Sequence, residues 1–91
     1  MSRDDYLTTW RRLLATAMAG RDDAGPVIAY APDEAAFDVR FDASYGSEEG
    51  PPVLAWTHDY VYFPVMYDGS EWLGSAPRNP TATGQDHVGG G

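Results

Sequence analysis

The segment YVYFPVMYDGSEWLGSAP, residues 60–77, predicts a β-hairpin around which the rest of the fold is arranged. Its first half is rich in aromatic and β-branched residues, which are typical of a strand. Asp68-Gly69 is a strong signal for a tight hairpin turn. If this turn has two residues, Trp72 pairs with Val65. Proline donates no hydrogen bond to a β-ladder, so we expect a bulge or bend at Pro64, where the strand pairing diverges.

Three segments upstream of the hairpin have the period of two that is expected of strands. They are residues 27–31, 36–42 and 53–57, and the last is joined to the hairpin by a turn at His58-Asp59. Between the first two, Pro32-Asp33-Glu34 predicts a turn. The apolar residues of segment 36–42 share one face of its predicted strand: Phe37, Val39 and Phe41.

The N-terminal segment predicts an amphipathic helix that starts at Ser2, a good N-cap, and stops at Gly20. Its apolar residues recur at helical spacing: Tyr6, Leu7, Trp10, Leu13, Leu14, Ala17 and Met18. Arg11 lies off this stripe and is expected to face solvent or a neighbouring acidic strand.

The predicted fold class is therefore α+β, with the helix packed on an antiparallel meander of about five strands. We assign residues 1–77 to one domain. Residues 78–91 are rich in Gly, Pro and Thr and can bury little apolar surface, so we expect a tail that is mobile or draped on the surface.

Strand alternation divides the aromatic stretch between two faces. Val61, Phe63 and Val65 fall on one face, with Leu54 and Trp56 of the preceding strand, and we expect the helix to cover this face. The other face carries Tyr60, Tyr62 and Met66, which are expected to be half exposed. Trp72 joins the core face if the second turn has two residues, and a shift of one residue moves it to the opposite face.

The chain is strongly acidic, with 14 acids, six arginines, no lysine and a formal net charge of −8. Residues 1–25 contain four acids and four arginines, so residues 26–91 carry the whole imbalance. Such a charge disfavours direct binding to nucleic acid or anionic membranes and favours a basic protein partner. It is also explained by solubility alone.

Six of the acids occur within seventeen positions: Asp33, Glu34, Asp38, Asp42, Glu48 and Glu49. On the predicted strand, Asp38 and Asp42 lie on one face, roughly 13 Å apart. This pattern predicts a carboxylate-rich face that docks onto a basic protein surface, such as that of a nucleic-acid-binding protein. Phage-encoded inhibitors that mimic nucleic acids work in this way, and the analogy rests on charge and size. A solvated edge that prevents strand aggregation is the other interpretation.

A second hypothesis is a site for a small ligand or a peptide on the aromatic face. Its residues would be Tyr60, Tyr62, Met66, Trp72 and Arg78. Tyr, Trp, Met and Arg are enriched in interfaces, and Arg78 would bind a carboxylate or phosphate.

No motif predicts catalysis, a metal site or a cofactor. The chain has no cysteine, and His58 and Asp59 are adjacent in a turn, where we expect their side chains to diverge. The segment from Asp42 begins like a calcium loop but has Val53 at the twelfth position, where a glutamate is required. We therefore expect a non-enzymatic, cytoplasmic protein that is a monomer or a weak homodimer, with neither an export signal nor a membrane span.

Overall fold

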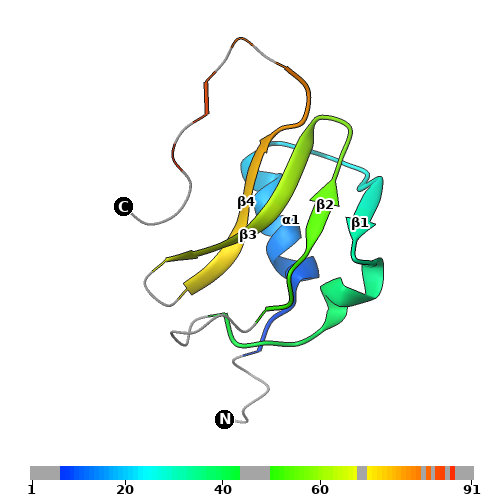
Figure 1. Ribbon diagram of the computed structural model, residues 1–91, viewed down its shortest axis with the longest axis vertical. Coiled ribbons are helices and arrows are strands. Elements are labelled where there is room, and N and C mark those ends of the chain that lie inside the picture. Colours follow the sequence, from blue (N-terminus) through cyan, green and yellow to red (C-terminus); the bar gives the residue numbers. More distant parts are fainter. Residues whose placement is uncertain are drawn as a thin grey trace.

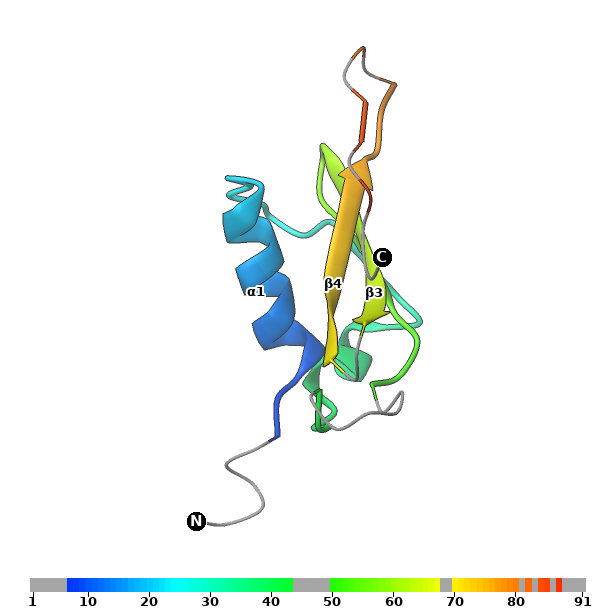
Figure 2. The same ribbon diagram turned by 90° about the vertical axis from the view of Figure 1, so that its left-hand side faces the viewer.

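The computed structural model describes residues 7–43, 50–67, 70–80, 82, 84, 85 and 87. Its elements in chain order are α1 (Trp10–Gly20), β1 (Ala29–Ala31), the 3₁₀ helix η2 (Glu34–Asp38), β2 (Leu54–Trp56), β3 (Tyr60–Tyr67) and β4 (Ser70–Pro77). The strands form one antiparallel sheet in the order β1-β2-β3-β4. Helix α1 lies against one face of this sheet (Figures 1 and 2). The α+β class is confirmed, with four strands in the described part of the chain where about five were predicted.

The predicted strand over residues 36–42 is wrong, because residues 36–38 belong to η2 and the rest of the segment joins no strand of the sheet. The carboxylate of Asp33 accepts a hydrogen bond from the backbone N–H of Ala36 at 3.0 Å and so caps the helix. Phe37 and Phe41 are both buried, whereas Val39 is 49% exposed. Phe37 lies in η2, whereas Phe41 follows an extended Val39 and pairs with Thr8, so the local cap at Asp33 prevails over the alternating pattern.

Helix α1 begins later than predicted. Thr9 is its N-cap, with an extended backbone and a side chain that accepts a hydrogen bond from the N–H of Arg12. Thr8 exchanges two backbone hydrogen bonds with Phe41, at 2.8 and 3.0 Å, so the chain is extended before the helix. Ser2 lies outside the described residues. The predicted end is confirmed, since Gly20 is the last helical residue.

The predicted register of both hairpins is confirmed. Trp56 pairs with Val61 across the turn at His58-Asp59, and Val65 pairs with Trp72. Pairing between β2 and β3 stops at Ala55 and Tyr62, while β3 and β4 stay paired to the end of β3. Pro64 lies just beyond the point where β2 and β3 separate, as its missing N–H predicts (Figure 1).

The predicted assignment of the two sheet faces is wrong. Ala55, Tyr62 and Leu73 are buried in one cluster with Trp10 and Leu14 of α1. Val61, Phe63 and Val65 have the opposite parity on β3 and are only half-buried. Alternation identified which residues share a face. It could not identify the face that α1 covers, because both faces are apolar.

Part of the predicted tail is described, namely residues 78–80, 82, 84, 85 and 87. Gln85 accepts a hydrogen bond of 2.7 Å from the guanidinium of Arg21, at the C-terminal end of α1. The tail therefore meets the helix side of the molecule at this residue. The mobility of residues 78–91 stays a prediction.

Candidate interaction surfaces

Three of the six predicted partner-binding acids lie on or beside η2, and we call Asp33, Glu34 and Asp38 the acidic surface. The side chains of Glu34 and Asp38 are 63% and 58% exposed. Asp33 is also exposed, although its carboxylate caps η2. This short helix therefore concentrates carboxylates without the strand that the sequence predicted.

Arg11 of α1 reaches across to the acidic surface. Its Nε and Nη2 atoms donate hydrogen bonds to the two oxygens of Asp38 at 2.6 and 3.1 Å, and Nη2 lies 3.5 Å from Glu34. The hydrogen bond from Arg11 holds the pKa of Asp38 below its usual range. The pair links η2 to α1.

The remaining predicted acids do not join this group as expected. Asp42 is half-buried after Phe41 and shares no strand with Asp38. Glu48 and Glu49 lie outside the described residues.

The residues of the predicted ligand site are spread over different parts of the molecule. Tyr62 is fully buried, and Met66 is exposed on the same side of β3. Tyr60 packs under the guanidinium of Arg21, whose carbon lies 4.8 Å from the ring centre. Trp72 is on the opposite sheet face, and Arg78 donates a hydrogen bond to the carbonyl of Thr57 at 3.0 Å. These five residues do not form one binding surface.

A buried polar network explains why Tyr62 faces the core. Its hydroxyl donates to the carboxylate of Asp23 at 2.7 Å, and the hydroxyl of Thr57 donates to the same oxygen at 2.7 Å. The N–H of Gly25 donates to the second oxygen at 2.9 Å. This network ties the segment after α1 to β2 and β3. A buried tyrosine hydroxyl needs a hydrogen-bond partner, so a tyrosine on a predicted core strand could have indicated such a network.

The network shifts the pKa values of both partners. Partial burial opposes ionisation of Asp23, but the hydrogen bonds from Thr57, Gly25 and Tyr62 outweigh it and hold its pKa below the usual range. Burial, followed by the hydrogen bond to Asp23, raises the pKa of Tyr62 above its ordinary value. The carboxylate therefore stays charged and the phenol stays neutral, which suits a structural role.

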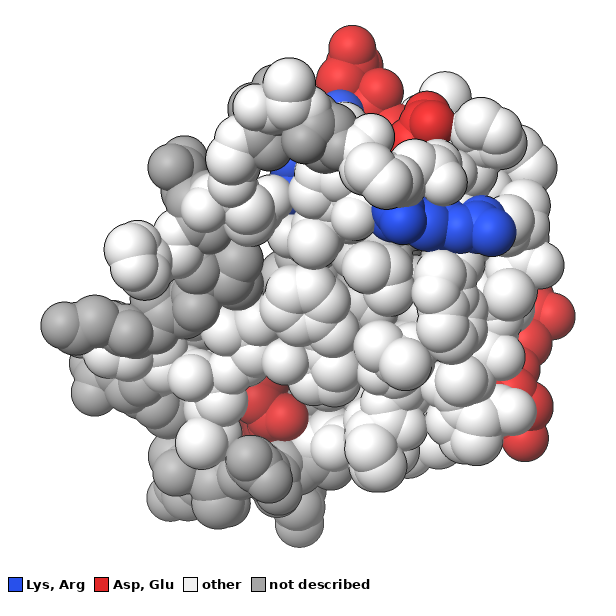
Figure 3. Space-filling view, turned by 45° about the horizontal axis from the view of Figure 1, so that its top comes forward, with Lys and Arg blue, Asp and Glu red and all other residues white. Residues whose placement is uncertain are grey.

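The sheet face opposite α1, which we call the outer face, is apolar over all four strands. Strand pairing and alternation place these residues on it: Ala29, Ala31, Leu54, Trp56, Val61, Phe63, Val65, Tyr67, Ser70, Trp72, Gly74 and Ala76. None of them is charged, and the large side chains among them are half-buried or exposed. Figure 3 looks obliquely onto this side and shows a broad uncharged area at its centre. Exposed apolar patches of this kind mark interaction sites.

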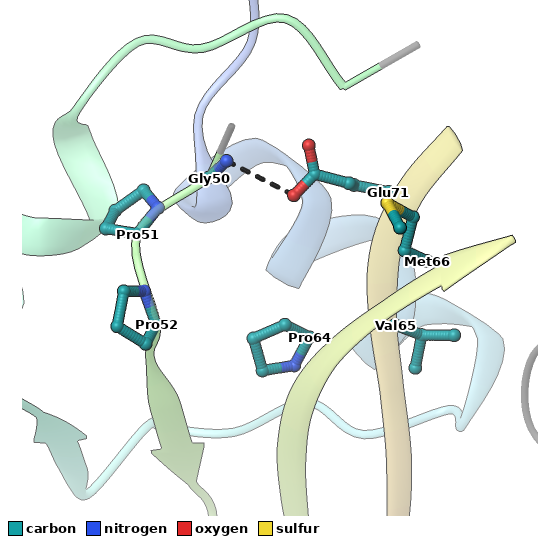
Figure 4. A pocket seen from close by; sticks show the side chains of 7 residues that line it. All are labelled: Gly50, Pro51, Pro52, Pro64, Val65, Met66 and Glu71. Carbon is teal, nitrogen blue, oxygen red and sulfur yellow. Dashed lines mark hydrogen bonds between the residues drawn. The ribbon is translucent and has the colours of Figure 1, made fainter. Parts of the chain in front are cut away.

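A hollow of about 420 Å³ opens where β2 and β3 separate (Figure 4). Its lining is Gly50, Pro51, Pro52, Pro64, Val65, Met66 and Glu71. The buried carboxylate of Glu71 accepts a hydrogen bond from the N–H of Gly50 at 3.2 Å, and its own N–H donates to the carbonyl of Ala43 at 2.6 Å. Glu71 therefore anchors both ends of the segment between residues 43 and 50 onto β4.

The His58-Asp59 turn differs from the prediction in one respect. The side chains do not diverge, because Nδ1 of His58 lies 2.9 Å from a carboxylate oxygen of Asp59. Both side chains are strongly exposed. Within the described residues, no group of three or more His, Cys, Asp or Glu side chains is placed to hold a metal ion. The described part of the chain also contains no helix with the length and apolar character needed to cross a membrane.

Comparison with protein-family models, with curated proteins and with solved structures finds no match for this chain.

Proposed function

We propose that this protein is a small non-enzymatic interaction module that docks its acidic surface onto a basic protein. The observation that carries the proposal is the gathering of Asp33, Glu34 and Asp38 at one short helix, with Glu34 and Asp38 more than half exposed. The chain around them has a net charge of −8, which attracts basic partners over a longer range.

Arg11 supports this proposal by holding the acidic surface in a defined geometry. It donates hydrogen bonds to both carboxylate oxygens of Asp38, whereas its Nη2 atom lies 3.5 Å from the carboxylate of Glu34. An incoming arginine or lysine would therefore meet Glu34 first and then compete with Arg11 for Asp38. Such a surface favours partners that present several basic side chains in a row, as nucleic-acid-binding proteins do. Docking would then prevent nucleic acid from binding the same arginine and lysine side chains.

The proposal implies that binding weakens steeply with salt. Exposed charges are screened over about 8 Å at physiological ionic strength, so rising salt slows association and lowers affinity. The partner would be held mainly by charged contacts at this surface.

A capture experiment with two matched variants tests the proposal. Glu34→Gln/Asp38→Asn removes two charges from the acidic surface, and Asp22→Asn/Asp59→Asn removes two charges from exposed acids elsewhere. Each immobilised protein is exposed to lysate of the source organism at low and high salt, and the retained proteins are quantified. We expect the wild type and the second variant to retain the same basic proteins at low salt only, and the first variant to lose them.

Equal losses from the two variants would mean that net charge alone causes capture, and the proposed site would then be wrong. Retention that does not change with salt would contradict the charged mechanism itself.

A further inference from the structure

We infer that the outer face binds the outer face of a second copy of this chain, forming a reversible homodimer. This goes beyond the proposed function, because it concerns another surface and does not depend on the acidic surface. Four features support it: the apolar composition of the outer face, the scarcity of apolar residues elsewhere in the chain that could cover it, its lack of charge and its area.

The residues of the outer face are contiguous across the sheet. In the strand register, Ala29, Trp56, Val61 and Ala76 form one row across all four strands. Val65 and Trp72 pair further along β3 and β4. Helix α1 lies on the other side of the sheet (Figure 2). The face is thus a single apolar layer of the kind that packs against another sheet.

The rest of the chain is poorly suited to cover this face. The residues outside the described ranges include only four large apolar side chains, those of Met1, Tyr6, Tyr45 and Val88. In the described part of the tail, Gln85 is hydrogen-bonded to Arg21 and therefore lies toward α1. A matching surface with two tryptophans, a phenylalanine and several aliphatic residues exists on a second copy.

Charge also favours a second copy at this face. Each chain has a net charge of −8, so most pairs of surfaces would bring carboxylates together. The outer face has no charged residue, so two copies meet there without like charges at the centre of the contact. In the row across the four strands, the small residues Ala29 and Ala76 stand at the two ends and Trp56 and Val61 lie between them.

The size of the face indicates a weak dimer. Strands β3 and β4 have eight residues each, which corresponds to a length of about 26 Å, and a width of three strands adds about 14 Å. The flat area is therefore roughly 360 Å², and side-chain relief increases the surface that is buried. Specific interfaces bury about 800 Å² on each partner. We therefore expect a dimer that dissociates on dilution.

The tryptophans provide a test in the unmodified protein. Trp56 and Trp72 lie on the outer face, whereas Trp10 is fully buried in the core. Sedimentation velocity and tryptophan emission are measured over the same range of protein concentrations. We expect a concentration-dependent shift from monomer to dimer, with a parallel blue shift of the emission as the outer tryptophans leave water.

Two variants of β3 add a matched control. Phe63→Glu places a charge at the middle of the outer face, and Met66→Glu places the same charge on the opposite side of the strand, at a residue that is 41% exposed. Phe63→Glu is expected to be monomeric at every concentration, while Met66→Glu dimerises like the wild type. Circular dichroism checks that each variant is folded.

The inference would be overturned by a wild-type protein that stays monomeric at all concentrations. A dimer that forms without a shift in tryptophan emission, or that forms equally in a folded Phe63→Glu, would overturn it too. If Phe63→Glu does not fold, the emission and sedimentation of the wild type decide the matter.

Discussion

The two faces of the sheet are built from similar residues but have different surroundings, and neighbouring positions on β3 show the contrast. Tyr62 is fully buried under α1, and Phe63 is half-buried on the outer face. Both are aromatic, so hydrophobicity does not distinguish them. Asp23 does, because its carboxylate accepts a hydrogen bond of 2.7 Å from the hydroxyl of Tyr62. A polar partner far along the chain therefore helps to select the covered face, and the other apolar face lies on the side of the sheet away from α1.

The largest expected effect comes from truncating each of these two rings. Tyr62→Ala should destabilise the fold by about 3–5 kcal/mol, since it leaves a cavity in a packed core. Phe63→Ala should cost about 1 kcal/mol in the monomer, because a half-exposed ring loses less burial. Urea denaturation at low protein concentration gives both free energies of unfolding. Equal costs would show that the two faces are buried to the same extent.

A second prediction concerns how tightly the covered side is packed. A Cβ atom at Gly50 would lie 2.5 Å from the ring of Trp10, so Gly50→Ala should destabilise the fold by about 1–3 kcal/mol. Gly20→Ala is the control, because nothing lies within 4 Å of a Cβ there. The control should leave the melting temperature unchanged or slightly higher. A Gly50→Ala protein as stable as the wild type would contradict the close contact with Trp10.

The Asp23 network predicts a dependence of stability on pH. The folded pKa of Asp23 is lowered, so its stabilising effect is present above the unfolded value of about 3.9 and is lost as pH falls toward the folded pKa. Urea midpoints measured from neutral to acidic pH should therefore fall below about pH 4. In the Asp23→Asn variant the urea midpoint should fall less steeply with pH. The Asp38→Asn variant, changed at an exposed site, should alter this pH dependence less than Asp23→Asn does. A pH profile of the Asp23→Asn variant that parallels the wild type would exclude Asp23 as the main source of the pH dependence of stability.

Removal of the phenol alone should have a smaller effect than loss of the whole ring. Tyr62→Phe takes one of three hydrogen bonds from Asp23 and should cost about 1–2 kcal/mol. Chemical denaturation measures this loss, and the equivalent change at Tyr60, which is Tyr60→Phe, serves as the comparison. A Tyr62→Phe variant with the same free energy of unfolding as the wild type would mean that the hydroxyl does not help to select the covered face.

The smallest effect is expected at Arg11. Its pairs with Asp38 and Glu34 are partly exposed, so Arg11→Gln should cost at most about 1 kcal/mol of stability. It should, however, release the acidic surface and change the affinity for a basic partner. Denaturation in low and high salt measures the stability effect, and a loss of several kcal/mol would show that the pair supports the fold itself.

The sequence allowed accurate prediction of local pairing. The Asp68-Gly69 signal led to the observed pairing of Val65 with Trp72, and the His58-Asp59 turn led to that of Trp56 with Val61. Both depend on residues close together in the chain. The covered face was not predictable from alternation, because its choice involves Asp23, which lies 39 residues before Tyr62.

Local capping explains the other two differences. Ser2 and Thr9 are both suitable N-caps, and the pairing of Thr8 with Phe41 is compatible only with the later start. In residues 36–42, alternating polarity predicted a strand, but Asp33 caps a helical turn. The acidic surface was identified in part, because Glu34 and Asp38 are close in sequence. The contact with Arg11 was foreseen only as a general attraction to a neighbouring acidic segment.

The salt dependence of self-association tests most directly the claim that the outer face, and not a charged surface, joins two copies. The dissociation constant of the wild-type dimer is measured by sedimentation equilibrium at increasing salt concentrations. We predict that it stays constant or decreases, since salt screens the repulsion between two chains of charge −8 and does not weaken apolar burial. A dimer that dissociates as salt rises would contradict the account.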